Sequence, residues 1–500
     1  MVLDYLLAGM NLVTDVQVLA LIVLGVTVGI MFGSMPGLTY SMGIILMLPL
    51  TFQLESLPAV ALLLGVYIGG MTGGSVSAIL LGIPGTPSAA ATVLDGFQLT
   101  KRGDAAKALG TAVFSSILAG LLSLVVLVLV APQIARIAIK FGPAEIFALV
   151  VFGFSTICGV SAGNLLKGLI SGVIGLLVMT IGLDPVMGVP RYTFGMSRLM
   201  SGVDLLAAMI GMFAIPQIIA NFTASDKEVY VVDQKVSASF PSWSEIRRML
   251  PLMIRCALIG IGIGSIPGSG GPIAAFLGYD QAKRKQGAGG ADKPSLEGVA
   301  GPEAANNGVT GGALIPLLTL GIPGDPATAI LLGALVIHGL RPGPLLFKEY
   351  GDFVYGVFVA IFLINLATLL IQFFGIRLFV KILGVQRYYL YPTILVLCVV
   401  GAFAVNNNFF DVYVMFFAGV MGYLLQKYGF PTTPVILALV LGPTIEDGFR
   451  RALILSSGDL LVFVESPVSI IFLSLTVLVL AKFYLSSGGS RQPGARQPKA

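Results

Sequence analysis

The sequence predicts an all-α, polytopic membrane protein of about twelve membrane segments, built as two homologous, inverted repeats with broken or re-entrant helices. Three observations lead to this fold class. The 500 residues are 56% hydrophobic and only 11% charged, whereas soluble domains are about 25% charged. Apolar segments recur along the whole chain, and helix-breaking motifs of the first half return in the second. A chain of this composition cannot cover itself with a solvated surface.

Apolar segments long enough to span a membrane, or to form paired half-spans, occur in both halves. In the first half they lie near residues 17–32, 58–72, 106–131, 144–160, 164–183 and 202–222. In the second half they lie near residues 249–266, 326–340, 353–376, 390–405, 409–428 and 467–485. We therefore divide the chain into a first transmembrane repeat (1–224), a polar, interfacial linker (225–248), a second transmembrane repeat (249–485) and a disordered basic tail (486–500).

The repeats are marked by motifs that break helices. GSMPG (33–37), TGG (72–74) and GIPGTP (82–87) in the first half match GSIPG (264–268), TGG (310–312) and GIPGDP (321–326) in the second, at offsets of 231, 238 and 239 residues. Three further glycines return at an offset of 247: Gly172, Gly175 and Gly182 match Gly419, Gly422 and Gly429. In an apolar chain, paired breaks at corresponding positions point to the binding site of a transporter.

The charge of the short loops indicates that the repeats are inverted. The loop after GIPGTP is basic, with Lys101, Arg102 and Lys107, whereas the loop after GIPGDP nearly balances its charges. Conversely, the loop after GSIPG contains the basic run KRK (283–285), and the loop after GSMPG contains Glu55 and no base. Because basic loops tend to face the cytoplasm, equivalent loops are expected on opposite sides of the membrane. Chance variation in loop charge is the alternative explanation.

Each Pro-Gly break is predicted to line a substrate cavity. Within the membrane, an interrupted helix is stable only where protein or water satisfies its free backbone groups, and the new helix N-terminus attracts a carboxylate. A single break is usually only a kink or a close-packing point, but four breaks in two matched pairs favour a binding site. The predicted substrate-binding residues are Pro36, Gly37, Thr39, Ser41, Pro84, Gly85, Thr86, Ser88, Pro267, Gly268, Ser269, Pro323, Gly324 and Thr328.

Ionisable and amide side chains within apolar segments are candidates for ion coupling, because they are costly to insert into a membrane. Asp325 lies inside GIPGDP where the first half has Thr86, so it breaks the symmetry of the repeats. A helix N-cap is the alternative role for Asp325. Glu303, Asn306 and Asn307 precede the second TGG motif and form a second polar group that can contact a ligand or an ion.

The motifs GSMPGLTYSMG, GGSVSAILLGIPGTPSAAATVLDGF, GSIPGSGGPIAAF and GGALIPLLTLGIPGDPATAILLGAL resemble the large membrane subunit of the tripartite tricarboxylate transporters, the TctA family, over residues 16–485. The resemblance implies a multi-pass secondary transporter of the bacterial inner (cytoplasmic) membrane. It implies no enzyme activity, no nucleic-acid partner and no cofactor other than transported Na⁺ or H⁺. The implied partners are a small membrane subunit of about four helices, a periplasmic solute-binding protein, the lipid bilayer and a di- or tricarboxylate such as citrate.

Other classes of protein fit less well. A self-sufficient ion-coupled organic-anion carrier or channel, without a binding protein, remains an alternative. An intramembrane aspartyl protease would need two catalytic aspartates, but Asp325 follows GIPG and Asp280 adjoins a basic run. The single histidine excludes an HExxH zinc site, and the glycine run before Pro267 lacks the Lys-Ser/Thr of a phosphate-binding loop. An ATP-driven pump is therefore disfavoured.

Overall fold

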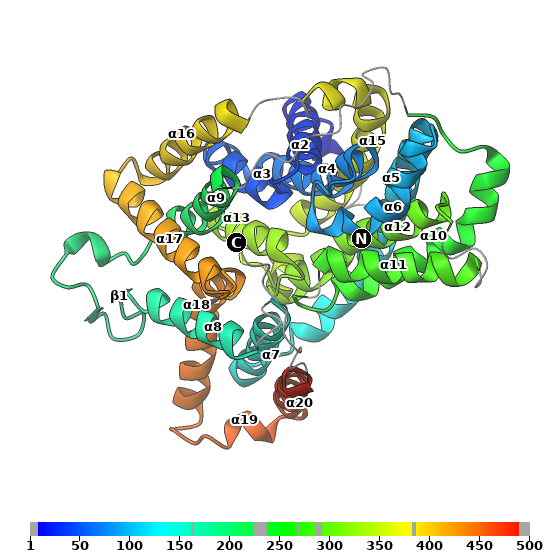
Figure 1. The fold of residues 1–500 in the computed structure, drawn as a ribbon. Coiled ribbons are helices and arrows are strands. Elements are labelled where there is room, and N and C mark those ends of the chain that lie inside the picture. Colours follow the sequence, from blue (N-terminus) through cyan, green and yellow to red (C-terminus); the bar gives the residue numbers. More distant parts are fainter. Residues whose placement is uncertain are drawn as a thin grey trace. The chain divides into compact units, whose positions relative to one another are not determined.

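The computed structural model describes residues 9–161, 165–223, 238–268, 270–286, 293–382 and 387–489. These residues are mostly helical, and they also contain one two-stranded antiparallel sheet (Figure 1). The chain divides into two compact units. The first comprises Met1–Lys140 and Asp204–Tyr423, and the second comprises Phe141–Val203 and Leu424–Ala500.

The first unit contains the segments that carry the Pro-Gly breaks. Its helices are α2 (Val16–Ser34), α3 (Tyr40–Met47), α4 (Ser56–Leu81), α5 (Ala90–Lys101), α6 (Ala105–Ala138), α9 (Leu205–Thr223), α10 (Trp243–Gly264), α11 (Gly270–Gln286), α12 (Glu297–Leu320), α13 (Pro326–Ile337), α14 (Pro344–Glu349), α15 (Gly351–Ile382), α16 (Arg387–Asn406) and most of α17 (Phe409–Lys427). Two 3₁₀ turns, η1 (Leu48–Thr51) and η2 (Pro87–Ala89), connect them.

The second unit is built around helix α18. Its elements are α7 (Pro143–Ser161), α8 (Leu165–Met179), β1 (Gly182–Leu183), β2 (Pro190–Arg191), η3 (Ser197–Leu199), α18 (Thr433–Leu455), α19 (Val462–Glu465) and α20 (Pro467–Gly489). Helix α18 packs against α7 and α8, and α20 packs against α7. The strands pair in antiparallel register, with Gly182 opposite Arg191.

The structure confirms an all-α membrane protein. Five helices of the described residues are long and apolar enough to cross a membrane: α2, α4, α6, residues Gly351–Lys381 of α15, and α17. Shorter apolar helices, including α8 and α13, accompany them. The total of about twelve segments and the inversion of the repeats stay predictions, as does the division of the chain by residue number.

The two predicted repeats contain the same order of elements, and one helix of each repeat packs against the other repeat. In each, a long helix is followed by a break and a shorter helix, then by a buried helix, a second break and a further helix: α2 to α6 in one, α10 to α15 in the other. Helix α6 of the first half packs along α12 of the second, and α15 of the second packs along α4 of the first. The two halves are therefore interleaved within one core.

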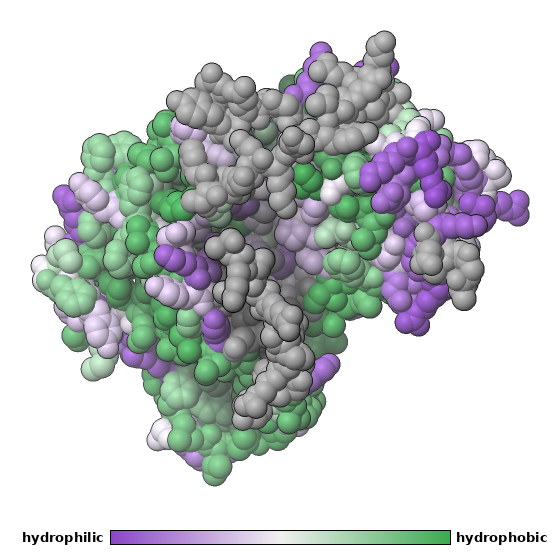
Figure 2. All heavy atoms as spheres, viewed as in Figure 1, coloured by the Kyte–Doolittle hydropathy of each residue, from purple (hydrophilic) through white to green (hydrophobic). Residues whose placement is uncertain are grey.

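Much of the visible face of the molecule is apolar (Figure 2). Figure 2 shows hydrophobic residues over much of the visible face, with hydrophilic residues gathered where α5, α10 and α11 are labelled in Figure 1. Exposed bases on these helices include Lys101, Arg247, Arg248 and Arg284. Ion pairs join the same helices to their neighbours, with Lys107 bonded to Glu245 at 2.6 Å. The predicted basic segments near residues 101 and 283 thus belong to one polar region of the first unit.

Helix α10 begins at Trp243, inside the segment predicted as the interfacial linker. Ser242 and Glu245 form a capping box, in which each side chain bonds the backbone of the other residue. This pair satisfies free N–H groups at the helix start, so the helix extends several residues beyond its apolar part. Residues 225–237 of the predicted linker and 490–500 of the predicted tail lie outside the described residues.

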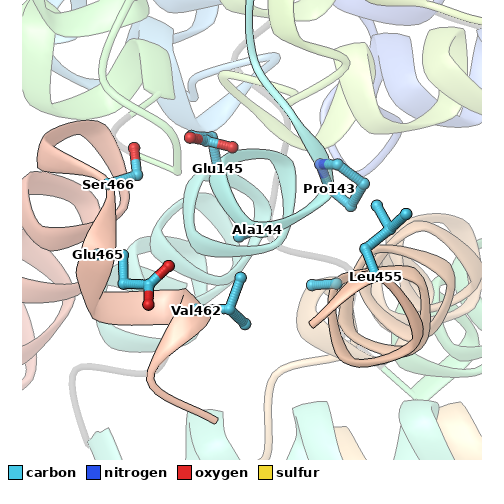
Figure 3. A pocket seen from close by; sticks show the side chains of 8 residues that line it. Pro143, Ala144, Glu145, Leu455, Val462, Glu465 and Ser466 are labelled. Atoms are coloured by element: carbon cyan, nitrogen blue, oxygen red, sulfur yellow. The ribbon is translucent and has the colours of Figure 1, made fainter. Parts of the chain in front are cut away.

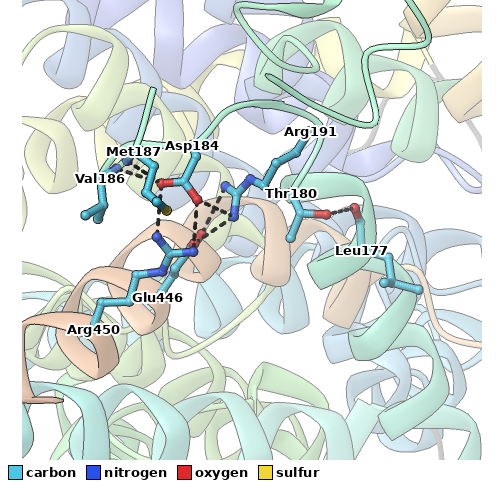
Figure 4. Close-up of polar contacts among 8 residues, drawn as sticks. All are labelled: Leu177, Thr180, Asp184, Val186, Met187, Arg191, Glu446 and Arg450. Carbon is cyan, nitrogen blue, oxygen red and sulfur yellow. Dashed lines mark hydrogen bonds and ion pairs between the residues drawn. The ribbon is translucent and has the colours of Figure 1, made fainter. Parts of the chain in front are cut away.

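A cluster of four charged side chains fixes the β-hairpin of the second unit to α18 (Figure 4). Asp184 accepts two hydrogen bonds from the Arg450 guanidinium, both 3.0 Å long, and one of 2.9 Å from the Met187 N–H. Arg191 lies 2.8 Å from Glu446, which is also paired with Arg450. The Met187 N–H and the Arg450 guanidinium hold the pKa of Asp184 well below its usual range.

We expect this cluster to lose stability in acid. A carboxylate with a lowered native pKa stabilises the fold fully above its unfolded pKa of about 4, and that contribution is lost as the pH falls further. The thermal midpoint should therefore fall between about pH 5 and about pH 2 more steeply in the wild type than in Asp184→Asn. The variant should already be less stable at neutral pH.

Thermal unfolding in detergent across this pH range checks the prediction. Asp447→Asn is the control, because Asp447 is an exposed carboxylate of the same helix α18. It should keep the wild-type pH dependence. Equal pH dependence in the wild type and Asp184→Asn would contradict the assignment.

Candidate substrate and ion site at the Pro-Gly breaks

The backbone has the same conformation at matched glycines of the two halves. Helices α4 and α12 end in left-handed caps at Gly82 (φ 68°) and Gly321 (φ 69°). Gly37 (φ 90°) and Gly268 (φ 79°) also have positive φ, after α2 and α10 respectively. Positive φ is readily adopted only by glycine. The repeated glycines therefore end α4 and α12 in the same way, and they give the turns after α2 and α10 the same positive φ, as the sequence motifs predict.

Within each half, the two breaks contact each other through glycine backbone. A Cβ atom added to Gly85 would overlap the carbonyl oxygen of Gly33, and one added to Gly324 would overlap the carbonyl oxygen of Gly264. In the second half the Gly268 N–H also donates to the Gly324 carbonyl oxygen at 2.9 Å. The structure thus brings together the breaks of each pair. A side chain at Gly85 or Gly324 would force them apart.

Three elements meet around the side chain of Asn306. Its amide Nδ2 donates to the Met71 carbonyl oxygen of α4 at 3.3 Å, while its buried Oδ1 has no hydrogen-bond partner among the described residues. A Cβ added to Gly271, at the start of α11, would lie 2.7 Å from this Oδ1 and 2.9 Å from the Cβ of Ser88. The unpaired oxygen can accept a hydrogen bond from a ligand or bind a cation. The adjacent N-terminus of α11 attracts an anion.

Thr86 and Ser88 lie beside this point with their side chains buried. Their hydroxyl oxygens are 3.1 Å apart, and Ser88 also contacts the sulfur of Met71. Thr86 is the residue before the turn η2, but its side chain makes no cap bond there. The Thr86 hydroxyl therefore does not have the capping role that a Thr before a helix often has.

Asp325 is both a helix cap and a bridge between the halves. Its Oδ1 accepts from the Thr328 N–H at 2.7 Å, and the Thr328 hydroxyl is 2.9 Å from the Asp325 N–H, which completes a capping box at α13. Its Oδ2 accepts from the Tyr67 hydroxyl of α4 at 2.6 Å. Asp325 therefore has the N-cap role that the sequence offers as an alternative. The sequence does not predict its contact with Tyr67.

Glu303 and Asn307 belong to a second chain of hydrogen bonds, which crosses between the halves. The Glu303 carboxylate accepts from Thr92 of α5 at 2.6 Å and from Ser116 of α6 at 3.2 Å. The Asn307 amide donates to Ser116 at 2.8 Å, and its oxygen accepts from Thr72 at 2.9 Å. All five side chains are buried. The acid and the amide come from α12, and every hydroxyl comes from the first half.

Most of the remaining predicted residues that the structure describes are half-buried. Thr39 accepts a hydrogen bond from the Met42 N–H at 3.3 Å and so caps α3. Gly37 accepts one from the Gln217 amide at 2.8 Å. Pro36, Gly37, Thr39, Ser41, Pro84 and Gly268 are half-buried, Pro267 and Pro323 are buried, and Ser269 lies outside the described residues.

Asp95 is a buried acid of the first half that forms polar contacts with the second half, and sequence reasoning did not identify it. Its carboxylate accepts from Tyr279 at 2.9 Å, from Lys283 at 2.8 Å and from the Ser295 N–H at 3.0 Å. Asp95 is 4% exposed and Lys283 13% exposed as side chains, so the ion pair between α5 and α11 is largely buried. The signal was present: an acid stands among apolar residues in TVLDGF.

A small cavity of about 200 Å³ lies within the second unit (Figure 3). It is lined by Pro143, Ala144, Glu145, Ala452, Leu455, Val462, Glu465 and Ser466. Two of these side chains are carboxylates, which repel another carboxylate. This cavity is therefore poorly suited to an anionic substrate.

Gly85→Leu and Gly324→Leu should each abolish transport while the protein still inserts into the membrane. The added side chain would displace the facing glycine carbonyl, and a displacement of about 1 Å at a site can cost about a hundredfold in rate. Uptake by membrane vesicles and the amount of inserted protein are the measurements. Gly262→Leu is the control, because nothing lies within 4 Å of a Cβ at Gly262. Normal uptake by both break variants would refute a role for the breaks.

Asp95→Ala should lower stability, because it leaves the Lys283 ammonium buried without its acid. Breaking one side of a buried ion pair typically costs about 3–5 kcal/mol. The apparent thermal midpoint in detergent should fall, and the double variant Asp95→Ala/Lys283→Met should recover part of the loss. An unchanged midpoint in the single variant would show that the pair contributes nothing.

Comparison with known proteins agrees with these features. Residues 19–437 match the model of the tripartite tricarboxylate transporter TctA family. An uncharacterized 52.8 kDa protein in the TAR-I ttuC′ 3′ region of Agrobacterium vitis is 36% identical over 466 residues, covering 91% of each chain. An uncharacterized protein in the TAR-II ttuC′ 3′ region of the same organism is 37% identical over 222 residues, covering 44% of this chain and 92% of its own. No solved structure matches. The chain is a member of the tripartite tricarboxylate transporter TctA family.

Proposed function

We propose that this chain is the large membrane subunit of an ion-gradient-driven secondary transporter that imports a di- or tricarboxylate, such as citrate. Membership of the TctA family supports a subunit of a tripartite transporter. In the proposal, a periplasmic binding protein delivers the substrate and a small four-helix membrane subunit completes the complex in the bacterial inner membrane.

The observation that carries the proposal is the contact between the paired breaks. In both halves a glycine of the second break packs on the carbonyl of the first, at Gly85 and at Gly324. Two of the helices that start after the breaks, α11 and α13, begin beside buried polar side chains, Asn306 and Tyr67 respectively. A helix N-terminus carries free N–H groups and a partial positive charge, which suit a carboxylate group.

The interleaving of the halves supports repeats that are related by a two-fold axis. Helix α6 of the first half packs on α12 of the second, and α15, which holds the matching place in the second half, packs on α4 of the first. A two-fold axis would produce such an exchange for inverted or parallel repeats, and the charge of the short loops favours the inverted arrangement. Residues Glu303, Asn306, Asn307 and Asp325 would then lie near this axis and couple transport to an ion.

Reconstitution of the complete transporter tests the proposal. Proteoliposomes that contain this chain and both partner proteins should accumulate labelled citrate or another di- or tricarboxylate when a Na⁺ or pH gradient is imposed, each varied separately. Omission of the binding protein should abolish uptake. Undiminished uptake by this chain alone would instead favour a self-sufficient carrier or channel. Failure with every carboxylate and both gradients would reject the proposed function.

A further inference from the structure

We propose that Glu303 is a proton-binding site, and that the ion coupled to transport at this residue is H⁺ and not Na⁺. The coupling role rests on the proposed function, whereas the bound proton does not. Glu303 lies in the interior of α12, and none of its surface is exposed. Its carboxylate therefore has no access to solvent in this conformation.

The first argument is that Glu303 has no cationic partner. Among the described residues, the hydrogen-bond partners of its two oxygen atoms are the neutral hydroxyls of Thr92 and Ser116. In the described part of the chain, no ion pair includes Glu303. A buried carboxylate without a compensating charge is so costly that such groups usually become neutral. A proton provides that neutrality.

The charged groups on the helices around α12 are engaged elsewhere or exposed. On α5, Asp95 bonds Lys283 and Tyr279 of α11. Three ion pairs engage further groups: Lys107 of α6 with Glu245 of α10, Arg248 of α10 with Glu297 of α12, and Asp280 with Arg284 on α11. The Tyr67 hydroxyl of α4 donates a hydrogen bond to Asp325. Lys101, Arg136, Arg247, Arg255, Lys348 and Glu349 are exposed, His338 bonds Thr51, and Cys256 bonds the Gly278 carbonyl. No charge of these described groups faces Glu303.

The second argument is the spacing of the oxygen atoms. The Glu303 Oε1 and Thr92 Oγ1 atoms are 2.6 Å apart, which is the separation of a direct O–H···O hydrogen bond and leaves no room for a cation between them. A metal ion needs several oxygen ligands spread around it, each more than about 2 Å away. Ser116 is already committed, since it donates to Glu303 and accepts from Asn307.

The third argument is the contrast with Asp325. That carboxylate sits at the N-terminus of α13 and accepts hydrogen bonds from the Thr328 N–H and the Tyr67 hydroxyl. Helix N-termini stabilise negative charge, so the position of Asp325 favours the carboxylate form more than an interior position of a helix would. Glu303 lies six residues inside α12 and has no such field. Of the two acids, Glu303 is therefore the one whose surroundings favour a bound proton.

Glu303→Gln tests the coupling role, because glutamine keeps the shape of a protonated glutamate but cannot release a proton. In proteoliposomes with both partner proteins, uptake driven by a pH gradient should fall about tenfold or more, within the usual range of coupling free energies. Exchange of internal for external carboxylate, which needs no net proton movement, should persist. Glu297→Gln is the matched control on the same helix and should keep pH-driven uptake.

Two results would overturn the proposal. One is pH-driven uptake by Glu303→Gln at the wild-type level. The other is wild-type uptake that follows the Na⁺ gradient, ignores the pH gradient and is lost in Glu303→Gln.

Infrared spectroscopy tests the proton itself, without transport. The purified wild-type chain and Glu297→Gln should show the band of a protonated carboxyl group at neutral pH, and Glu303→Gln should lack it. An identical band in all three proteins, or none in the wild type, would refute the proton site. If the wild type shows the band but transports no carboxylate, the proposed function fails while the proton site stands. This measurement also decides the case if Glu303→Gln is inactive in exchange.

Discussion

The contact between broken helices is the constraint on which the rest of the structure depends. A helix interrupted within an apolar environment leaves N–H and C=O groups that must find partners in the protein. Here the second break of each half packs its glycine directly on the first break, at Gly33 with Gly85 and at Gly264 with Gly324. Only glycine permits this approach, which explains why the same residue recurs at matched positions of both halves.

This packing determines where the polar chemistry lies. Because α4 and α12 each end at a break, their interior residues face the opposite half, and polar contacts between the halves form there: Tyr67 with Asp325, Thr72 with Asn307, and Thr92 with Glu303. In these three contacts the first half contributes hydroxyls, while the second contributes two acids and an amide. The two halves are thus chemically different here, so the two ends of the site can bind different parts of a substrate and its coupling ion.

Sequence reasoning predicted the membrane class, the family and the four breaks, because composition, the recurrence of apolar segments and the glycine motifs can all be read directly from the sequence. It could not predict which helices pack together. Nothing in the spacing of Thr92, Ser116 and Glu303 indicates that they meet, since their contact depends on the exchange of α6 between halves. Asp95 was overlooked for the same reason: its partners Tyr279 and Lys283 are almost two hundred residues away in the chain. The early start of α10 at Trp243 was readable from its capping box.

The central claim is that a carboxylate binds between the paired breaks. A density map of the complete transporter with bound citrate tests it most directly. The account predicts substrate density within hydrogen-bond distance of Ser88 or of the backbone at the start of α11 or α13. Density confined to another place, such as the cavity beside Glu145 and Glu465, with the breaks empty, would contradict it.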